Sequence, residues 1–146
     1  MRWMNEPLSF EQQLERHGTL TYTNKGTSME PLLRQGRDLF TVTKKGPDRC
    51  RVGDVVLFRH RGNYVLHRVI KVRAADYVCR GDNAIGTEAV AEEDVLGLMS
   101  SFVRDGRPGT VNDPAYRAYT ALVLIIQGPR VLAKRALLRL KKLLEK

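Results

Sequence analysis

Alternation of apolar and polar positions through the middle of the chain predicts β structure. Candidate strands lie at residues 20–24, 39–42, 55–58, 64–72, 77–80 and 95–103. Arg61-Gly62-Asn63 separates two of these runs and predicts a hairpin turn. Several short strands at this spacing are typical of a barrel or a sandwich, so a mainly β fold is expected.

A short helix is predicted at the N-terminal end of this β region, from about Ser9 to Arg16. Ser9 followed by Gln12 forms a capping-box pattern. Gly18 suits the left-handed residue that commonly ends a helix. We therefore expect one helix before the first strand.

The period becomes helical after Asp113, so residues 1–113 are expected to form a body and residues 114–146 a helical extension. Gly128-Pro129 predicts a break within the extension, with one helix from Pro114 to Gln127 and a second beginning at Pro129.

The second of these helices is amphipathic and basic. Its apolar stripe contains Leu132, Ala133, Ala136, Leu137, Leu140, Leu143 and Leu144. Its opposite side contains Arg130, Lys134, Arg135, Arg139, Lys141, Lys142 and Lys146, and Val131 and Leu138 fit neither side. Three interpretations stay open: the stripe packs on the body, lies on an anionic membrane, or docks to a partner.

Composition narrows the function classes. The chain carries a net charge of +9, but most of that charge lies in the tail, so nucleic-acid binding is not expected. The absence of HExxH, P-loop and dinucleotide-binding motifs predicts neither a metal nor a cofactor. Cys50 and Cys79 are expected to be free thiols, although spacing alone does not say whether they pair.

The sequence shows no secretory signal and no membrane span. The N-terminal residues are rich in charge, and the longest uncharged stretch, 118–129, is shorter than the roughly 20 apolar residues that a spanning helix needs. A cytoplasmic protein is expected, with membrane contact through the basic extension as the alternative.

Three residues carry candidate chemistry. Ser28 follows Gly26-Thr27 in a turn, and a serine hydroxyl becomes a nucleophile only with a base within reach. His67 lies in a strand-like run, and an imidazole can take and return a proton near neutral pH. Asp82 offers a carboxylate that could orient such an imidazole. Each residue alone is equally typical of ordinary turns and strands.

In their order along the chain, these segments resemble the signal peptidase I family. The matching pieces are Ser28-Met29-Glu30-Pro31, Gly53-Asp54-Val55-Val56-Leu57-Phe58, His67-Arg68-Val69-Ile70, Gly81-Asp82-Asn83 and Val95-Leu96-Gly97. The similarity is greatest to the endoplasmic-reticulum and archaeal branch, in which histidine replaces the lysine base. It covers residues 21–103 and implies the β barrel that signal peptidases share with LexA-type self-cleaving repressors.

The resemblance implies a serine endopeptidase that cleaves a peptide or protein precursor, such as a leader or signal-like peptide. Ser28 would be the nucleophile, His67 the general base, and Asp82 the favoured acid beside His67. A further family aspartate has no aspartate counterpart here, and Glu88 is the nearest acid, so Glu88 is the alternative partner of His67.

The resemblance also bears on the surroundings of the nucleophile. Gly26 has no side-chain hydroxyl to place in an oxyanion hole, so the backbone N–H of Ser28 is expected to carry that role. Gly26, Met29 and Pro31 are expected to lie beside the substrate.

Two other functions remain open. A non-catalytic binding module of the same fold could use the basic extension. A self-cleaving LexA-type protein would need an N-terminal effector domain, and too few residues precede Ser28 for a DNA-binding module.

Overall fold

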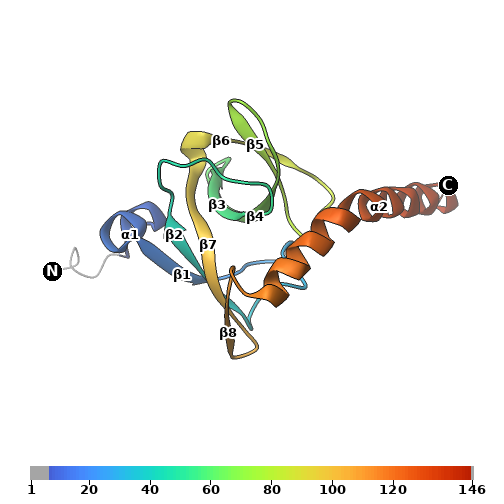
Figure 1. Ribbon diagram of the computed structural model, residues 1–146. Coiled ribbons are helices and arrows are strands. Elements are labelled where there is room, and N and C mark those ends of the chain that lie inside the picture. The colour runs from blue at the N-terminus through green and yellow to red at the C-terminus, as the bar shows by residue number, and fades with distance from the viewer. Residues whose placement is uncertain (1–6, 146) are drawn as a thin grey trace.

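The structure is a computed structural model, and it describes residues 7–145. The body of the protein is one eight-stranded antiparallel sheet (Figure 1). Its strands are β1 Thr19–Thr23, β2 Leu39–Lys44, β3 Val55–His60, β4 Asn63–Val72, β5 Asp76–Arg80, β6 Glu88–Ala91, β7 Val95–Arg104 and β8 Arg107–Thr110. The order across the sheet is β1-β2-β7-β3-β4-β5-β6, with β8 paired to β7. The predicted mainly β architecture is confirmed.

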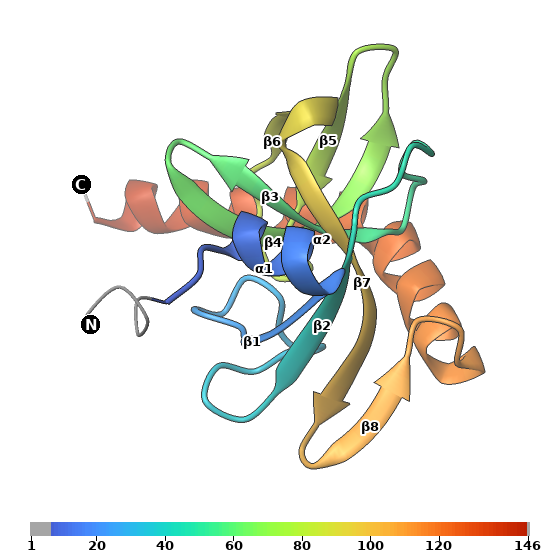
Figure 2. The same ribbon diagram turned by 90° about the vertical axis from the view of Figure 1, so that its left-hand side faces the viewer.

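The sheet is strongly curved but stays open, which corrects the expected closed barrel (Figure 2). Closure would require the two end strands to pair with each other. Within the described residues β1 pairs with β2 alone and β6 with β5 alone. One long edge of β1 is therefore left without a strand neighbour.

Two strands have no counterpart among the predicted ones because their sequences carry a weak signal. β6 has four residues, of which only Val90 is buried. β8 reads Arg-Pro-Gly-Thr, and proline and glycine are depleted in strands. β8 pairs within the described residues only with β7, an edge position that tolerates Pro108.

The predicted hairpin between β3 and β4 is present and sets the register of the site. Arg61 and Gly62 both have positive φ, 52° and 81°, as a tight two-residue hairpin turn requires. This turn pairs Val56 with His67 and Val55 with Arg68. Because consecutive side chains of a strand point to opposite faces, His67 and Arg68 face different surroundings.

The N-terminal helix is found where it was predicted. Helix α1 spans Phe10–His17, and Ser9 and Gln12 form the reciprocal capping-box hydrogen bonds. Gly18 closes the helix at a φ of 75°. Leu14 faces inward and is buried in the core beside β1.

The segment that follows Ser28 is anchored in the core. Met29 and Leu33 are fully buried, and Leu32 is 2% exposed. These side chains belong to the same apolar cluster as Phe40 of β2 and Leu57 of β3. The buried segment fixes the backbone immediately after Ser28.

Helix α2 runs without interruption over Pro114–Leu144, so the predicted break at Gly128-Pro129 is wrong. On either side of Pro129 the helix contacts the body: Arg80 donates to Gln127, and Arg130 donates to the Ala84 carbonyl. A proline inside a helix removes one backbone hydrogen bond, and its ring clashes with the preceding turn, so it kinks or breaks the helix. Helix α2 changes direction along its length but stays continuous past the proline (Figures 1 and 2).

The two halves of α2 differ in their surroundings. Tyr116 is buried in the core, and Val131 is the last buried residue of the helix. Every described residue from Leu132 to Glu145 is exposed, and this half projects away from the sheet (Figure 1). No helix among the described residues is long and apolar enough to cross a membrane.

Candidate active site

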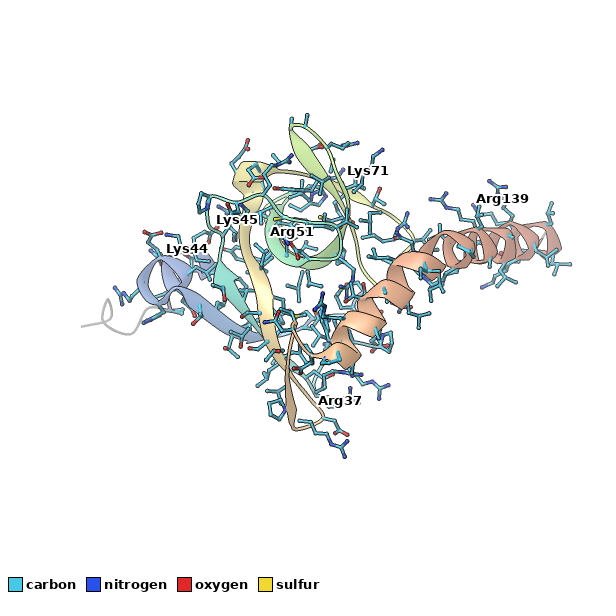
Figure 3. The ribbon with its side chains drawn as sticks, viewed as in Figure 1. Arg37, Lys44, Lys45, Arg51, Lys71 and Arg139 are labelled. Carbon is cyan, nitrogen blue, oxygen red and sulfur yellow. The ribbon has the colours of Figure 1, made fainter. Side chains whose placement is uncertain are left out.

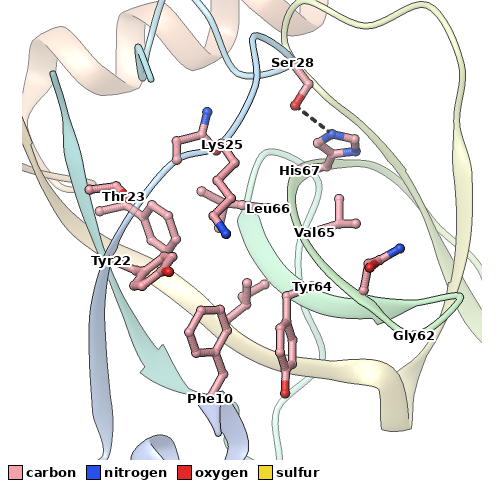
Figure 4. A pocket seen from close by; sticks show the side chains of 14 residues that line it. Phe10, Tyr22, Thr23, Lys25, Ser28, Gly62, Tyr64, Val65, Leu66 and His67 are labelled. Atoms are coloured by element: carbon pink, nitrogen blue, oxygen red, sulfur yellow. Dashed lines mark hydrogen bonds between the residues drawn. The ribbon is translucent and has the colours of Figure 1, made fainter. Parts of the chain in front are cut away.

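Ser28 and His67 meet although 39 positions separate them in the chain. The Ser28 hydroxyl lies 3.1 Å from Nε2 of His67 (Figure 4). Ser28 lies in the loop between β1 and β2, and His67 lies near the middle of β4. The distance is that of a hydrogen bond between a nucleophile and its base.

The loop after β5 holds the Ser28 backbone. The Asn83 N–H donates to the Ser28 carbonyl at 2.8 Å, and the Asn83 side chain donates to the Thr27 carbonyl at 3.1 Å. A Cβ at Gly81 would lie 2.6 Å from the Ser28 carbonyl oxygen and 3.0 Å from His67 Nε2. Only glycine fits this position without displacing the pair.

Glu88 is the carboxylate that contacts the histidine. The His67 Nδ1–H donates to Glu88 Oε1 at 2.5 Å. Glu88 is the first residue of β6, where it pairs with Cys79 of β5. A carboxylate at Nδ1 favours the tautomer whose Nε2 accepts a hydrogen bond, which is the nitrogen that faces Ser28.

Asp82 does not contact His67, which corrects the preference for Asp82 over Glu88. Arg68 donates to both Asp82 oxygens at 2.8 Å, and the Tyr119 hydroxyl donates to Oδ2 at 2.7 Å. The cause is strand alternation: Arg68 follows His67 on β4 and turns Asp82 toward the opposite face. Within the Gly81-Asp82-Asn83 motif, the glycine and the asparagine are the residues that touch the Ser28 segment.

The Arg68–Asp82 pair joins the sheet to α2. The Arg68 side chain is fully buried and the Asp82 side chain is 1% exposed. Arg68 also donates to the Gly53 carbonyl at 2.7 Å and to Thr120 of α2 at 3.1 Å. Burial and the neighbouring Asp82 carboxylate raise the pKa of Tyr119 far above its usual range, so its hydroxyl stays a donor.

A groove of about 470 Å³ opens beside Ser28 and His67. β1 with its following loop supplies one wall, β4 the other, and α1 the far end (Figure 4). Its lining residues are Phe10, Tyr22, Thr23, Asn24, Lys25, Ser28, Phe40, Leu57, Gly62, Asn63, Tyr64, Val65, Leu66 and His67. An extended chain segment can lie between two such walls.

The far end of the groove is aromatic, which the sequence analysis did not predict. The Phe10 ring lies 4.9 Å from that of Tyr22 and 4.5 Å from that of Tyr64. Lys25 extends between this end and Ser28 (Figure 4), with its ammonium 5.9 Å from the centre of the Tyr22 ring. The three aromatic residues come from three separate elements, so no local motif indicates that they converge.

The three residues expected beside the substrate do not line this groove. Gly26 has a φ of 77° and donates its N–H to Gln35, which shapes the loop before Ser28. The Met29 side chain is fully buried in the core and cannot face a substrate. Pro31 is exposed, and none of the three lines the groove. Gly26 and Met29 therefore shape and anchor the Ser28 loop.

Neither Cys50 nor Cys79 lines the groove. Cys50 and Cys79 are free and buried, and burial raises the pKa of the Cys79 thiol to about 12. Such a thiol is not a nucleophile near neutral pH. Residues 7–145 contain no group of three or more His, Cys, Asp and Glu side chains placed to hold a metal ion.

No protein-family model matches this sequence.

Proposed function

We propose that the protein is a serine endopeptidase of the signal peptidase I type, with a LexA-like fold, that cleaves a peptide or protein precursor. The observation that carries the proposal is the line of contacts from the Ser28 hydroxyl through His67 to Glu88 at one side of a groove. A hydroxyl, an imidazole and a carboxylate in this order are the components of nucleophilic acyl transfer.

In the proposed reaction, Ser28 Oγ attacks the carbonyl carbon of the scissile peptide bond. His67 Nε2 takes the hydroxyl proton and then returns it to the leaving amine, and Glu88 stabilises the imidazolium in between. A water molecule, deprotonated by the same nitrogen, then releases the acyl group and regenerates Ser28.

The backbone N–H of Ser28 is the proposed oxyanion donor. It makes no hydrogen bond within the described part of the chain. A main-chain donor beside the nucleophile stabilises the negative charge that develops on the carbonyl oxygen. Gly26 offers no side chain for this task, in agreement with that assignment.

Covalent labelling with a fluorophosphonate, followed by peptide mass analysis, tests this function. We expect one adduct on Ser28, which Ser28→Ala and His67→Gln abolish and the matched control Ser101→Ala retains. Cleavage of a peptide library should follow the same pattern. Cleavage that persists in Ser28→Ala would remove the mechanism, and a non-catalytic module would give neither adduct nor cleavage.

A further inference from the structure

Helix α2 presents an uninterrupted line of exposed apolar side chains. This exposed stripe consists of Leu122, Ile125, Ile126, Leu132, Leu137, Leu140, Leu143 and Leu144, which are between 42% and 79% exposed. It begins in the half of the helix that packs on the sheet and continues into the half that projects beyond it (Figure 1). The body of the protein therefore does not cover it.

The stripe has the shape of one helix face. At 100° per residue its eight members fall within an arc of about 140°, and at 1.5 Å per residue it is about 33 Å long. Val131 and Leu138, which fit neither side of the sequence pattern, lie outside the arc. Val131 instead faces the body, where it is 5% exposed.

Basic side chains border the stripe along the projecting half. Residues 130–145 contain six basic side chains and one acidic side chain, Glu145. Among the described residues, none of these six forms an ion pair with an acidic group. Arg139 extends from the projecting half of the helix, away from the sheet (Figure 3). Within residues 7–145, no ion pair therefore compensates their positive charge.

We propose that α2 binds the surface of an anionic membrane, with the exposed stripe at the boundary between headgroups and acyl chains. An interfacial helix combines an apolar face with a basic polar face and lies in the plane of the membrane. Long basic side chains beside the stripe can extend to lipid phosphates while their stems stay in the apolar layer. The helix is too charged to span the bilayer, in agreement with an interfacial position.

Charge argues against a second copy of the chain as the occupant. Pairing two stripes would bring two helices together that each carry six basic groups and one acid in residues 130–145. Helix pairs of that kind usually alternate opposite charges beside their apolar seam. An anionic lipid surface, by contrast, attracts each basic side chain.

Sedimentation of the full-length protein with vesicles tests the proposal. We expect binding to phosphatidylglycerol–phosphatidylcholine vesicles at low salt, weaker binding as salt rises, and no binding to pure phosphatidylcholine. Equal binding to both kinds of vesicle, or binding to neither, would overturn the proposal. The readout is independent of peptidase activity.

Two neighbouring leucines provide a matched pair of variants. Leu137 lies within the stripe and is 65% exposed, whereas Leu138 lies outside it and is 50% exposed. Leu137→Gln should weaken partitioning about ten-fold, and Leu138→Gln should leave it nearly unchanged. Because both side chains are exposed, neither change should lower the melting temperature. Equal losses in the two variants would overturn the stripe as the contact surface.

A lysine pair tests the electrostatic part. Lys141→Gln should weaken partitioning about five-fold, because a basic residue near an anionic surface contributes that factor. Lys71→Gln removes the same charge from β4, outside the helix, and should have no effect. A concentration-dependent dimer that Leu137→Gln dissolves, without vesicle binding, would instead assign the stripe to self-association and overturn the proposal.

Discussion

His67 and Arg68 are consecutive residues of β4, yet they belong to two polar clusters of opposite character. The His67–Glu88 contact borders the groove, and its side chains are 12% and 17% exposed. The Arg68–Asp82 pair is buried between the sheet and α2, with side chains 0% and 1% exposed. Each cluster pairs one basic side chain, an imidazole or a guanidinium, with one carboxylate.

The difference lies in how many partners each carboxylate has. Asp82 accepts from Arg68 through two nitrogens and from Tyr119, so three donors hold its two oxygens. A buried ion pair of this kind is retained only when further hydrogen bonds satisfy both groups. Glu88 instead contacts an imidazole whose other nitrogen faces Ser28. We therefore expect the Arg68–Asp82 cluster to govern stability and the His67–Glu88 cluster to govern reactivity.

The largest expected effect is that of removing the nucleophile. Ser28→Ala should lower kcat about a million-fold, because the other members of such a unit do not act without it. The melting temperature should change little, since among residues 7–145 the hydroxyl bonds only to His67. Activity and thermal unfolding measured on the same preparation would check both parts. An active Ser28→Ala enzyme would end the assignment of the groove cluster to catalysis.

The next effect separates the two carboxylates. Glu88→Gln should lower kcat about ten-thousand-fold, because an amide at Nδ1 can stabilise the wrong histidine tautomer. Glu93→Gln, an exposed change of the same kind in the η2 turn Glu92–Asp94, is the matched control and should retain full activity.

Asp82→Asn should act mainly on stability. If Asp82→Asn lost more activity per folded molecule than Glu88→Gln, the acid beside His67 would have to be Asp82 after all.

Much of the fold follows from local sequence. The capping residues of α1, the alternation along β3 and β4, and the two-residue turn between them are each encoded within a few positions. Closure of the sheet is not encoded locally, because it depends on whether the strands β1 and β6, which are distant in the sequence, pair with each other. Continuity of α2 past Pro129 likewise depends on contacts with Arg80 and Ala84.

The candidate site was predicted in part for the same reason. The ordered motifs identified Ser28 and His67, which the structure brings together. They also indicated Asp82 as the acid beside His67. The motif does not reveal that Asp82 meets the face of β4 that carries Arg68 and not the face that carries His67. Glu88 was the alternative acid, because it is the nearest acid to the position of the missing family aspartate. Its four-residue strand has no pattern of its own, and the β5–β6 pairing is what places Glu88 beside His67.

A third prediction tests the buried cluster directly. Arg68→Ala should lower the free energy of unfolding by about 3–5 kcal/mol, because it leaves the Asp82 charge buried without its main partner. Arg73→Ala breaks an exposed Arg–Asp pair with Asp76 and should change stability little. Denaturant unfolding of the three proteins would measure the difference.

Adding Asp82→Ala to Arg68→Ala should recover part of the loss, since the unpaired charge is then removed. A double variant less stable than Arg68→Ala would show that the pair matters through packing and not through charge.

The smallest effect concerns the link between the buried cluster and α2. Tyr119→Phe removes a 2.7 Å hydrogen bond to the charged Asp82 and should cost about 1.5–3 kcal/mol. Tyr116→Phe removes only a 3.3 Å contact with Arg68 and should cost about 1 kcal/mol or less. At about 2–4 °C per kcal/mol, the two melting temperatures should differ measurably. The Ser28 adduct should form at unchanged rate in both variants, because neither hydroxyl touches the groove cluster. A Tyr119→Phe protein of normal stability but slowed Ser28 labelling would show that the Arg68–Asp82 cluster governs reactivity and not stability.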